Sequence, residues 1–271
     1  MEATTAAPAG RGDPPATGGA RHRLDVLRVL TTSDLRVRYG RGGLRYLKWI
    51  LDPLAALGVY LVLVSLVLTR GADAIGLSLA CAIVPFTLLM ASIVNALTAV
   101  QLRGSILLNM GFPRMLIPIA SVLTETIAFT ASLVLLPVMM LIYGVEPTAA
   151  VLWLPVALAI TVVLALALAY PSTLFGIWYP ELQPFAVSFA RAGFFLAAGL
   201  VALDEVTGEA RDLLPYNPLT GLFESFRDAL LYGRSPAAWE LLVPLGAAAV
   251  VLAISVPVYM REQSRLAKLV G

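Results

Sequence analysis

Long runs of apolar residues constrain this chain more than any other feature. Several windows of more than eighteen residues contain almost no charged side chain, and about twenty apolar residues let a helix cross the hydrocarbon core of a membrane. Of the 271 residues, 59% are hydrophobic and 13% are charged, whereas a soluble domain is about 45–50% apolar and about 25% charged. We therefore expect an all-α integral membrane protein.

The apolar runs predict six transmembrane helices. The expected spans are residues 50–69, 75–100, 117–143, 149–175, 185–203 and 241–260. The expected organisation is a disordered cytoplasmic tail at residues 1–20, a basic interface segment at 21–49, the six-span domain at 50–260 and a cytoplasmic tail at 261–271.

The distribution of cations predicts the orientation. The segments expected inside hold fourteen Lys and Arg residues: nine before Trp49, Arg103 and Arg114 in the connector between the second and third spans, and three at the C-terminus. The segments expected outside hold four. Because cytoplasmic loops carry an excess of Lys and Arg, both termini are expected on the cytoplasmic side. The membrane concerned is expected to be the cytoplasmic membrane.

Two segments outside the spans have an amphipathic pattern. Between residues 21 and 49, Leu24, Leu27, Val29 and Leu30 form one apolar stripe among many cations, which is typical of an interfacial element bound to anionic lipid headgroups. The alternation from Asp34 to Tyr39 fits a strand equally well, and simple anchoring by positive charge also explains these cations.

The second amphipathic segment precedes the last span. Thr220 is expected to cap a helix over residues 221–232 that places its apolar side chains on one face and Glu224, Arg227 and Asp228 opposite. Such a helix is expected to lie on, or dip into, the outer leaflet.

Several kinds of chemistry lack their usual residues. The sequence has no phosphate-binding G-x-x-x-x-G-K-[ST] loop, its one histidine (His22) lies outside the spans, and its one cysteine (Cys81) has no neighbouring metal ligand. The net charge of +2 does not suggest a nucleic-acid partner. We therefore expect neither catalysis nor a metal site on this chain. Glu125 and Arg191 are expected inside spans, where they either line a path or form structural pairs, and Glu181 either contacts a partner or is solvated.

Three stretches carry a resemblance to a known family. They are Asp34-Leu-Arg-Val-Arg-Tyr39 with Asp52-Pro-Leu54, Asn109-Met-Gly-Phe-Pro-Arg-Met-Leu-Ile-Pro118, and the segment from Asn217-Pro-Leu-Thr220 to Gly233. In this order, and with six spans, the chain resembles the membrane subunit of ABC transporters that export polysaccharides such as lipid-linked O-antigen or teichoic acid. It departs from the family pattern at Arg45 and Lys48, before the first span, and at Pro180-Glu181, after the fourth.

The resemblance implies a homodimer of this chain with two ATPase subunits, which bind the ATP and Mg, and a lipid-linked glycan as cargo among the membrane lipids. It assigns Arg36, Arg38 and Tyr39 to a helix at the substrate entrance. It assigns Asn109, Phe112, Pro113 and Arg114 to the coupling helix that docks the ATPase, and Asn217, Pro218, Glu224 and Arg227 to an extracytoplasmic re-entrant element.

Aromatic side chains are candidates for the cargo path, because sugars stack on aromatic faces. Those candidates are Phe86, Trp178, Tyr179 and Phe185, although packing in lipid or in the core explains each one alone. Two other functions remain open: an ABC exporter of drugs or lipids with the same fold, and an ion-coupled carrier acting alone through Glu125 or Arg191.

Overall fold

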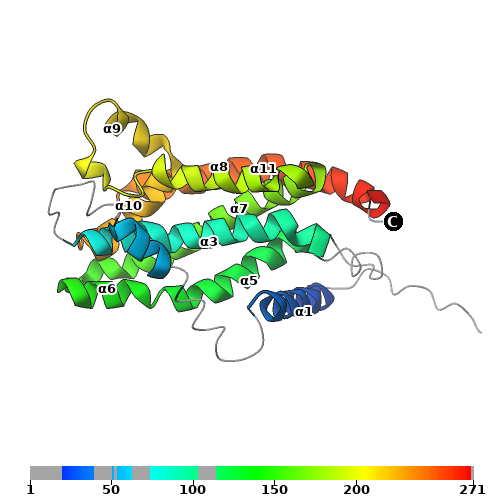
Figure 1. The fold of residues 1–271 in the computed structure, drawn as a ribbon, viewed down its shortest axis with the longest axis horizontal. Coiled ribbons are helices and arrows are strands. Elements are labelled where there is room, and N and C mark those ends of the chain that lie inside the picture. Colours follow the sequence, from blue (N-terminus) through cyan, green and yellow to red (C-terminus); the bar gives the residue numbers. More distant parts are fainter. Residues whose placement is uncertain (1–19, 40–50, 52–53, 63–73, 103–113, 270–271) are drawn as a thin grey trace, which may run out of the picture.

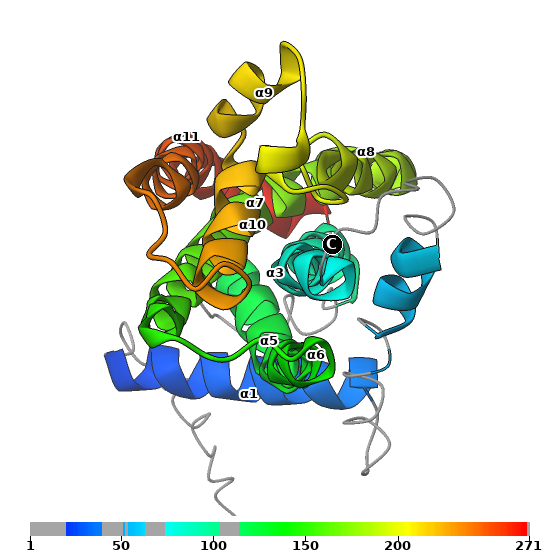
Figure 2. The same cartoon turned by 90° about the vertical axis from the view of Figure 1, so that its left-hand side faces the viewer.

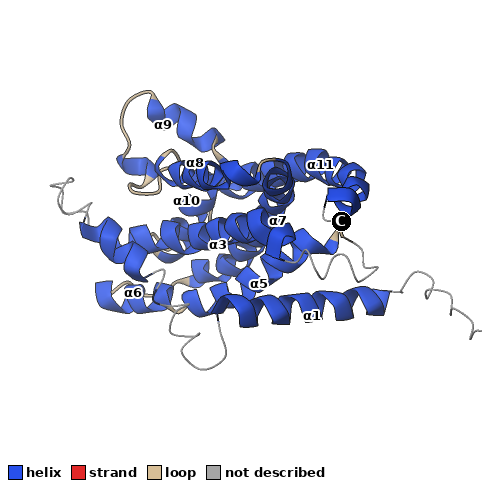
Figure 3. Ribbon diagram, turned by 45° about the vertical axis from the view of Figure 1, so that its right-hand side comes forward, coloured by secondary structure: helices blue, strands red, loops and turns tan. Residues whose placement is uncertain are grey.

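The computed structural model describes residues 20–39, 51, 54–62, 74–102 and 114–269. All regular elements in these ranges are helical, and none of the described residues forms a strand (Figure 3). The α-helices with fully described bounds are α1 (Ala20–Tyr39), α3 (Ile75–Leu102), α5 (Leu116–Ser132), α6 (Leu135–Tyr143), α7 (Leu154–Trp178), α8 (Gln183–Phe195), α9 (Ala210–Leu213), α10 (Pro218–Leu230) and α11 (Ala238–Leu269). Residues 54–62 are also helical, and short 3-10 turns join some of these elements.

The all-α membrane class predicted from the apolar runs is confirmed. Within the described residues, four helical segments are long and apolar enough to cross a membrane: Ile75–Leu102, Leu116–Tyr143, Ala149–Trp178 and Ala238–Glu262. These segments coincide with the second, third, fourth and sixth expected spans. Many of their apolar side chains face outward, such as Leu141 and Leu152, as expected for helices that face lipid.

The other two expected spans are not long apolar helices in the described structure. Of residues 50–69, the helical part described is 54–62 together with residue 51. The fifth expected span corresponds to α8, which has 13 residues and a length of about 20 Å at 1.5 Å per residue. That is shorter than the hydrocarbon core of about 30 Å, so the number of six spans stays a prediction.

The long helices lie side by side and alternate in direction along one axis (Figure 1). One end of this bundle, which we call the connector end, contains the C-terminus of α3, the N-terminus of α5 and the C-terminus of α7. The opposite end, which we call the α10 end, contains α10, the end of α6 and the start of α11. The connector itself, residues 103–113, lies outside the described residues, and so does the coupling helix implied by the resemblance, apart from Arg114.

The centre of the bundle is the contact between α3 and α7. Helix α3 is the most buried of the four long segments, and Figure 2 shows it surrounded by other helices. The two backbones meet closely at Gly176, where an added Cβ would lie 2.0 Å from the Leu97 carbonyl oxygen. Ala165, Ala167 and Ala169 are also fully buried. Small residues at a helix interface permit this close approach.

The third long segment is divided into α5 and α6 by Pro137. Proline has no N–H to donate, so the carbonyl of Leu133, four residues earlier, accepts a 3.2 Å hydrogen bond from the Leu136 N–H instead. Helix α6 then ends at Gly144, whose φ of 67° is the left-handed conformation that glycine adopts easily. The apolar run predicted one continuous span, and proline chemistry explains the interruption.

Helix α1 lies across the others. In Figure 1 it is seen nearly end-on below α5, while Figure 2 shows it running across the view in which α3 and α6 are end-on. The alternation of Asp34–Tyr39 left a strand open, and the structure is helical there. Residues 34–39 form the last part of α1, which is one continuous helix from Ala20 to Tyr39. Helix α11 extends to Leu269, through residues expected in the C-terminal tail.

Candidate functional site

One face of α1 holds it against the connector end of the bundle. Leu30 is buried against Ala99 of α3 and against Ile117 and Ala120 of α5, with Val26 and Leu27 packed beside them. The expected stripe is therefore shifted: Leu27 and Leu30 face inward, but Leu24 and Val29 are exposed. This packing orients α1 crosswise and turns its opposite face outward.

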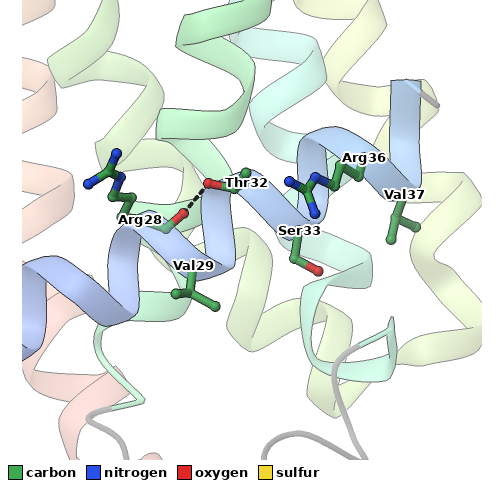
Figure 4. A pocket seen from close by; sticks show the side chains of 6 residues that line it. All are labelled: Arg28, Val29, Thr32, Ser33, Arg36 and Val37. Carbon is green, nitrogen blue, oxygen red and sulfur yellow. Dashed lines mark hydrogen bonds between the residues drawn. The ribbon is translucent and has the colours of Figure 1, made fainter. Parts of the chain in front are cut away.

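The outward face of α1 contains a shallow pocket of about 450 Å³. Arg28 and Arg36 flank the hydroxyls of Thr32 and Ser33, with Val29 and Val37 alongside (Figure 4). Two guanidinium groups eight residues apart on one helix face, with hydroxyls between them, suit anionic oxygens such as phosphates. Arg36, which the resemblance assigns to a helix at the substrate entrance, lines this pocket, and its role there stays a prediction. Arg38 and Tyr39 end α1, and their side chains lie outside the described part.

Two buried tyrosines tie the start of α5 to other helices. The Tyr259 hydroxyl donates a 3.0 Å hydrogen bond to the Arg114 carbonyl, and the Tyr170 hydroxyl reaches the Met115 carbonyl at 3.4 Å. Their rings meet edge to face, with centroids 5.4 Å apart. The residues directly after the connector are therefore joined to α7 and α11. Asn109, Phe112 and Pro113 lie outside the described residues.

Tyr170 and Tyr259 are not among the site residues predicted from the sequence. A tyrosine inside an apolar run is a recognisable signal, because a buried phenol usually finds a hydrogen-bond acceptor. The acceptor of Tyr259 is a backbone carbonyl 145 residues away in sequence, which no local pattern can identify.

The candidate path aromatics occupy two different environments. Phe86 is half-buried in a ring cluster, with its centroid 5.0 Å from that of Phe194 and 6.2 Å from that of Phe223. Trp178, Tyr179 and Phe185 are exposed where α7 ends and α8 begins. Phe86 therefore has packing neighbours within the chain, while the other three face outward at the connector end.

The two charged residues expected inside spans are not equivalent. Glu125 is buried and accepts a 3.0 Å hydrogen bond from the Asn95 side chain, which also approaches the Ser121 carbonyl at 3.4 Å. Arg191 is exposed on α8 and has no ion pair with any residue that the structure describes. Glu125 is therefore joined to α3 by a hydrogen bond inside the bundle, whereas Arg191 lies on an exposed face of α8; a path-lining role for either residue stays a prediction.

The α10 end contains a buried ion pair. Glu224 and Arg227 lie one turn apart on α10, with Glu224 Oε1 2.7 Å from Arg227 Nη1 and the arginine 0% exposed. Glu224 also accepts a 2.9 Å hydrogen bond from the Leu203 N–H. Asn217 caps this helix by accepting from the Leu219 N–H at 3.0 Å, and Pro218 is its first residue.

This arrangement corrects two expectations. The cap is Asn217, not Thr220, and the charged face of α10 does not face outward: residues 220–230 are all buried. The amphipathic pattern of α10 is real, but the folded chain covers both of its faces. Helices α3, α7 and α11 contact α10 and supply the apolar neighbours, while the chain after α8 supplies polar ones.

Arg227 binds the non-helical backbone that follows α8. Its guanidinium donates to the Ala198 carbonyl at 2.9 Å, the Gly199 carbonyl at 3.2 Å and the Ser78 hydroxyl at 3.0 Å. Ala198 has a φ of 48°, a left-handed conformation that is costly for a residue other than glycine. Arg227 thus satisfies carbonyls that a continuous helix would have bonded internally.

A second ion pair lies just beyond α10. Arg234 Nε donates a 2.8 Å hydrogen bond to Asp228 Oδ1, and Arg234 Nη2 lies 3.6 Å from Asp204. The pKa of Asp228 is raised above its ordinary value because burial outweighs the hydrogen bond and charge of Arg234, which lower it. The arginine also lies over the Tyr232 ring, 4.9 Å from its centroid. These contacts join the segments on either side of α10.

Comparison with known proteins identifies relatives of this chain. The O-antigen export system permease protein RfbA of Klebsiella pneumoniae is 25% identical over 211 residues, which cover 78% of this chain and 82% of that protein. The protein of the same name from Myxococcus xanthus is 28% identical over 229 residues, or 84% of this chain and 88% of the relative. The chain is a relative of O-antigen export permeases. No protein-family model matches it.

The relatives confirm the family resemblance drawn from the three sequence stretches. The alignments span about four-fifths of each chain, so the similarity extends over most of the chain and is not confined to one motif. The relatives are named as permeases, and the four long apolar helices of this chain agree with a membrane protein.

Proposed function

We propose that this chain is the transmembrane subunit of an ABC exporter that moves a lipid-linked polysaccharide out across the cytoplasmic membrane. The observation that carries the proposal is similarity over about 80% of the chain to permeases named for O-antigen export. The four long apolar helices support it, because a polar polymer needs a path walled by helices to cross hydrocarbon.

The proposed topology has six spans with both termini in the cytoplasm. Residues 50–69 would form the first span, and α8 with the chain after it would form the fifth. The excess of cations at the termini and in the connector supports this orientation. The connector end is then cytoplasmic and the α10 end is extracytoplasmic.

The proposed coupling site is the connector from Asn109 to Arg114. A separate ATPase subunit, which binds ATP and Mg, would dock there on each half of a homodimer. The hydrogen bonds from Tyr170 and Tyr259 support this role, because a displacement of the docked connector would reach α7 and α11 directly through the start of α5.

The proposed entrance for cargo lies beside α1. A helix lying crosswise at the cytoplasmic end, with Arg28 and Arg36 facing outward, is placed to meet anionic headgroups of the inner leaflet. Exposed aromatics at Trp178, Tyr179 and Phe185 would then offer stacking surfaces for sugars near the same end.

The test is purification of the tagged chain in mild detergent, with every co-purifying protein identified. The proposal predicts a stoichiometric ATPase subunit. Arg114→Glu and Phe112→Ala are expected to weaken that association while membrane insertion stays intact, and Tyr216→Phe, at an exposed position, serves as the control. Absence of an ATPase across several detergents would refute the proposal and favour a carrier acting alone.

A further inference from the structure

A cleft of about 490 Å³ lies between the last turns of α3 and the first turns of α8, at the connector end. Val94, Leu97 and Thr98 form one wall. The other wall is formed by Pro184, Val187, Ser188 and Arg191 of α8. Pro180, Glu181 and Gln183, at the start of α8 and just before it, complete the lining. Charged and hydroxyl side chains thus share a pocket with apolar ones, which is typical of a ligand site.

Gln183, which lines the cleft, is hydrogen-bonded to the backbone of α3 and α7. Gln183 Nε2 donates to the Leu97 carbonyl at 3.1 Å and to the Gly176 carbonyl at 3.3 Å, which fixes the start of α8 against α3 and α7. Gly176 itself is in close contact with Leu97. The walls are therefore positioned by the hydrogen bonds of the Gln183 side chain and by the close contact of α3 with α7, and not by the charged residues of the cleft.

The two charges of the cleft lie at different depths. Glu181 precedes α8, whereas Arg191 lies eight residues beyond Gln183, which is about 12 Å further along the helix axis. Arg191 has no ion pair with any described residue. In the proposed topology α8 is part of the fifth span, and a cation at membrane depth is costly and marks a functional site by default.

A neighbouring face of α8 is aromatic. Phe185 and Phe189 are one turn apart and are 67% and 73% exposed, beside the face that carries Pro184, Ser188 and Arg191. The polar cleft and an apolar surface therefore lie next to each other on one helix. This combination suits a molecule with an anionic headgroup and a long hydrocarbon chain.

We propose that this cleft binds the headgroup of the lipid-linked cargo, with the phosphate at Arg191 and the first sugar toward Glu181. The inference rests on the proposed function and specifies its substrate site. The order of charges agrees with it, because the lipid end of such a molecule lies deeper in the membrane than its sugar. Guanidinium forks match phosphate oxygens, and a carboxylate accepts hydrogen bonds from sugar hydroxyls.

The test is equilibrium binding to the purified full-length chain in phosphatidylcholine nanodiscs. The two probes are a radiolabelled long-chain isoprenoid phosphate and the same isoprenoid phosphate bearing one sugar. Arg191→Gln is expected to weaken both by about tenfold, which is about 1.4 kcal/mol. Glu181→Gln is expected to weaken only the sugar-bearing probe. Arg211→Gln, at an exposed arginine of α9, is expected to change neither.

Several outcomes would overturn the proposal. One is unchanged binding in Arg191→Gln, with the variant folded by gel filtration and thermal unfolding. Another is equal binding of the uncharged isoprenoid alcohol. Equal competition by phosphatidylglycerol would show a general site for bilayer phosphates instead of a cargo site. Because no ATPase is present in this assay, its result is independent of the co-purification test: either proposal can fail while the other stands.

Discussion

At the scale of single residues, Arg227 shows how a buried charge can complete a membrane fold. All of its neighbours named above are oxygen atoms, contributed by Ala198, Gly199, Ser78 and Glu224. A free carbonyl buried away from water is costly, and one planar guanidinium with five donors can satisfy several at once. The charge of Arg227 is in turn balanced by Glu224.

We predict that Arg227→Gln destabilises the folded chain by about 3 kcal/mol or more, because it leaves Glu224 as an unpaired buried charge. Arg227→Lys is expected to recover only part of the loss, since an ammonium cannot reproduce the fork. The measurement is thermal unfolding of the detergent-purified protein. Arg211→Gln is the control, and a wild-type melting temperature in Arg227→Gln would contradict the structure.

A second prediction concerns the closest helix contact. Gly176→Ala places a methyl group where the Leu97 carbonyl lies 2.0 Å away, and this backbone atom cannot move aside as a flexible side chain could. We expect a loss of about 1–3 kcal/mol in the free energy of unfolding.

The matched control for this prediction is Gly246→Ala on α11, where an added Cβ meets nothing within 4 Å. The two variants add the same group to helical glycines, so the difference between their melting temperatures reports the close approach alone. Equal melting temperatures would show that α3 and α7 are not in contact at Gly176.

At the scale of elements, the start of α5 depends on helices that are remote in sequence. Tyr259 belongs to α11 and Tyr170 to α7, and both hydroxyls bond to carbonyls at the exit of the connector. If the connector docks an ATPase, these bonds lie between the docking site and two of the long helices.

We therefore predict that Tyr259→Phe lowers ATP-dependent export while co-purification of the ATPase is retained. The lost hydrogen bond is worth only about 1 kcal/mol, so the variant is expected to remain folded. Transport into vesicles and ATPase stoichiometry are the two measurements, with Tyr216→Phe as the control. Unchanged export would show that the tyrosine only stabilises the bundle.

At the scale of the whole molecule, the open question is whether α8 crosses the membrane. Its helical part is short, and the chain beyond it continues without helix to Leu203 while Arg227 binds its carbonyls. Non-helical backbone at membrane depth is tolerated where protein covers it. A crossing made of α8 and this covered segment is therefore physically possible.

Labelling of single cysteines in whole cells tests whether α8 crosses the membrane. Cys81 is the only native cysteine and is buried, so little maleimide labelling of Cys81 itself is expected. With six spans, a membrane-impermeant maleimide labels Glu146→Cys and Gly208→Cys from outside, and Glu181→Cys only after the cells are opened. Labelling of positions 181 and 208 from the same side would exclude a crossing by α8.

The sequence alone predicted the class of this protein, four of its long helices and its resemblance to polysaccharide-export permeases. Apolar runs such as residues 75–100 suffice for this, because a helix satisfies its hydrogen bonds within the segment and an apolar run needs no partner to prefer lipid. Local patterns also marked α10 as amphipathic, but the residue that caps it was predicted wrongly.

Only the tertiary structure decided where the polar groups of these helices lie. The pattern of α10 could not show that its charged face would be covered, because Arg227 reaches Ser78, 149 positions away in sequence. The tyrosines at the connector exit and the cleft between α3 and α8 likewise arise where remote segments meet. Periodicity records which residues share a face, whereas the three-dimensional packing determines what that face meets.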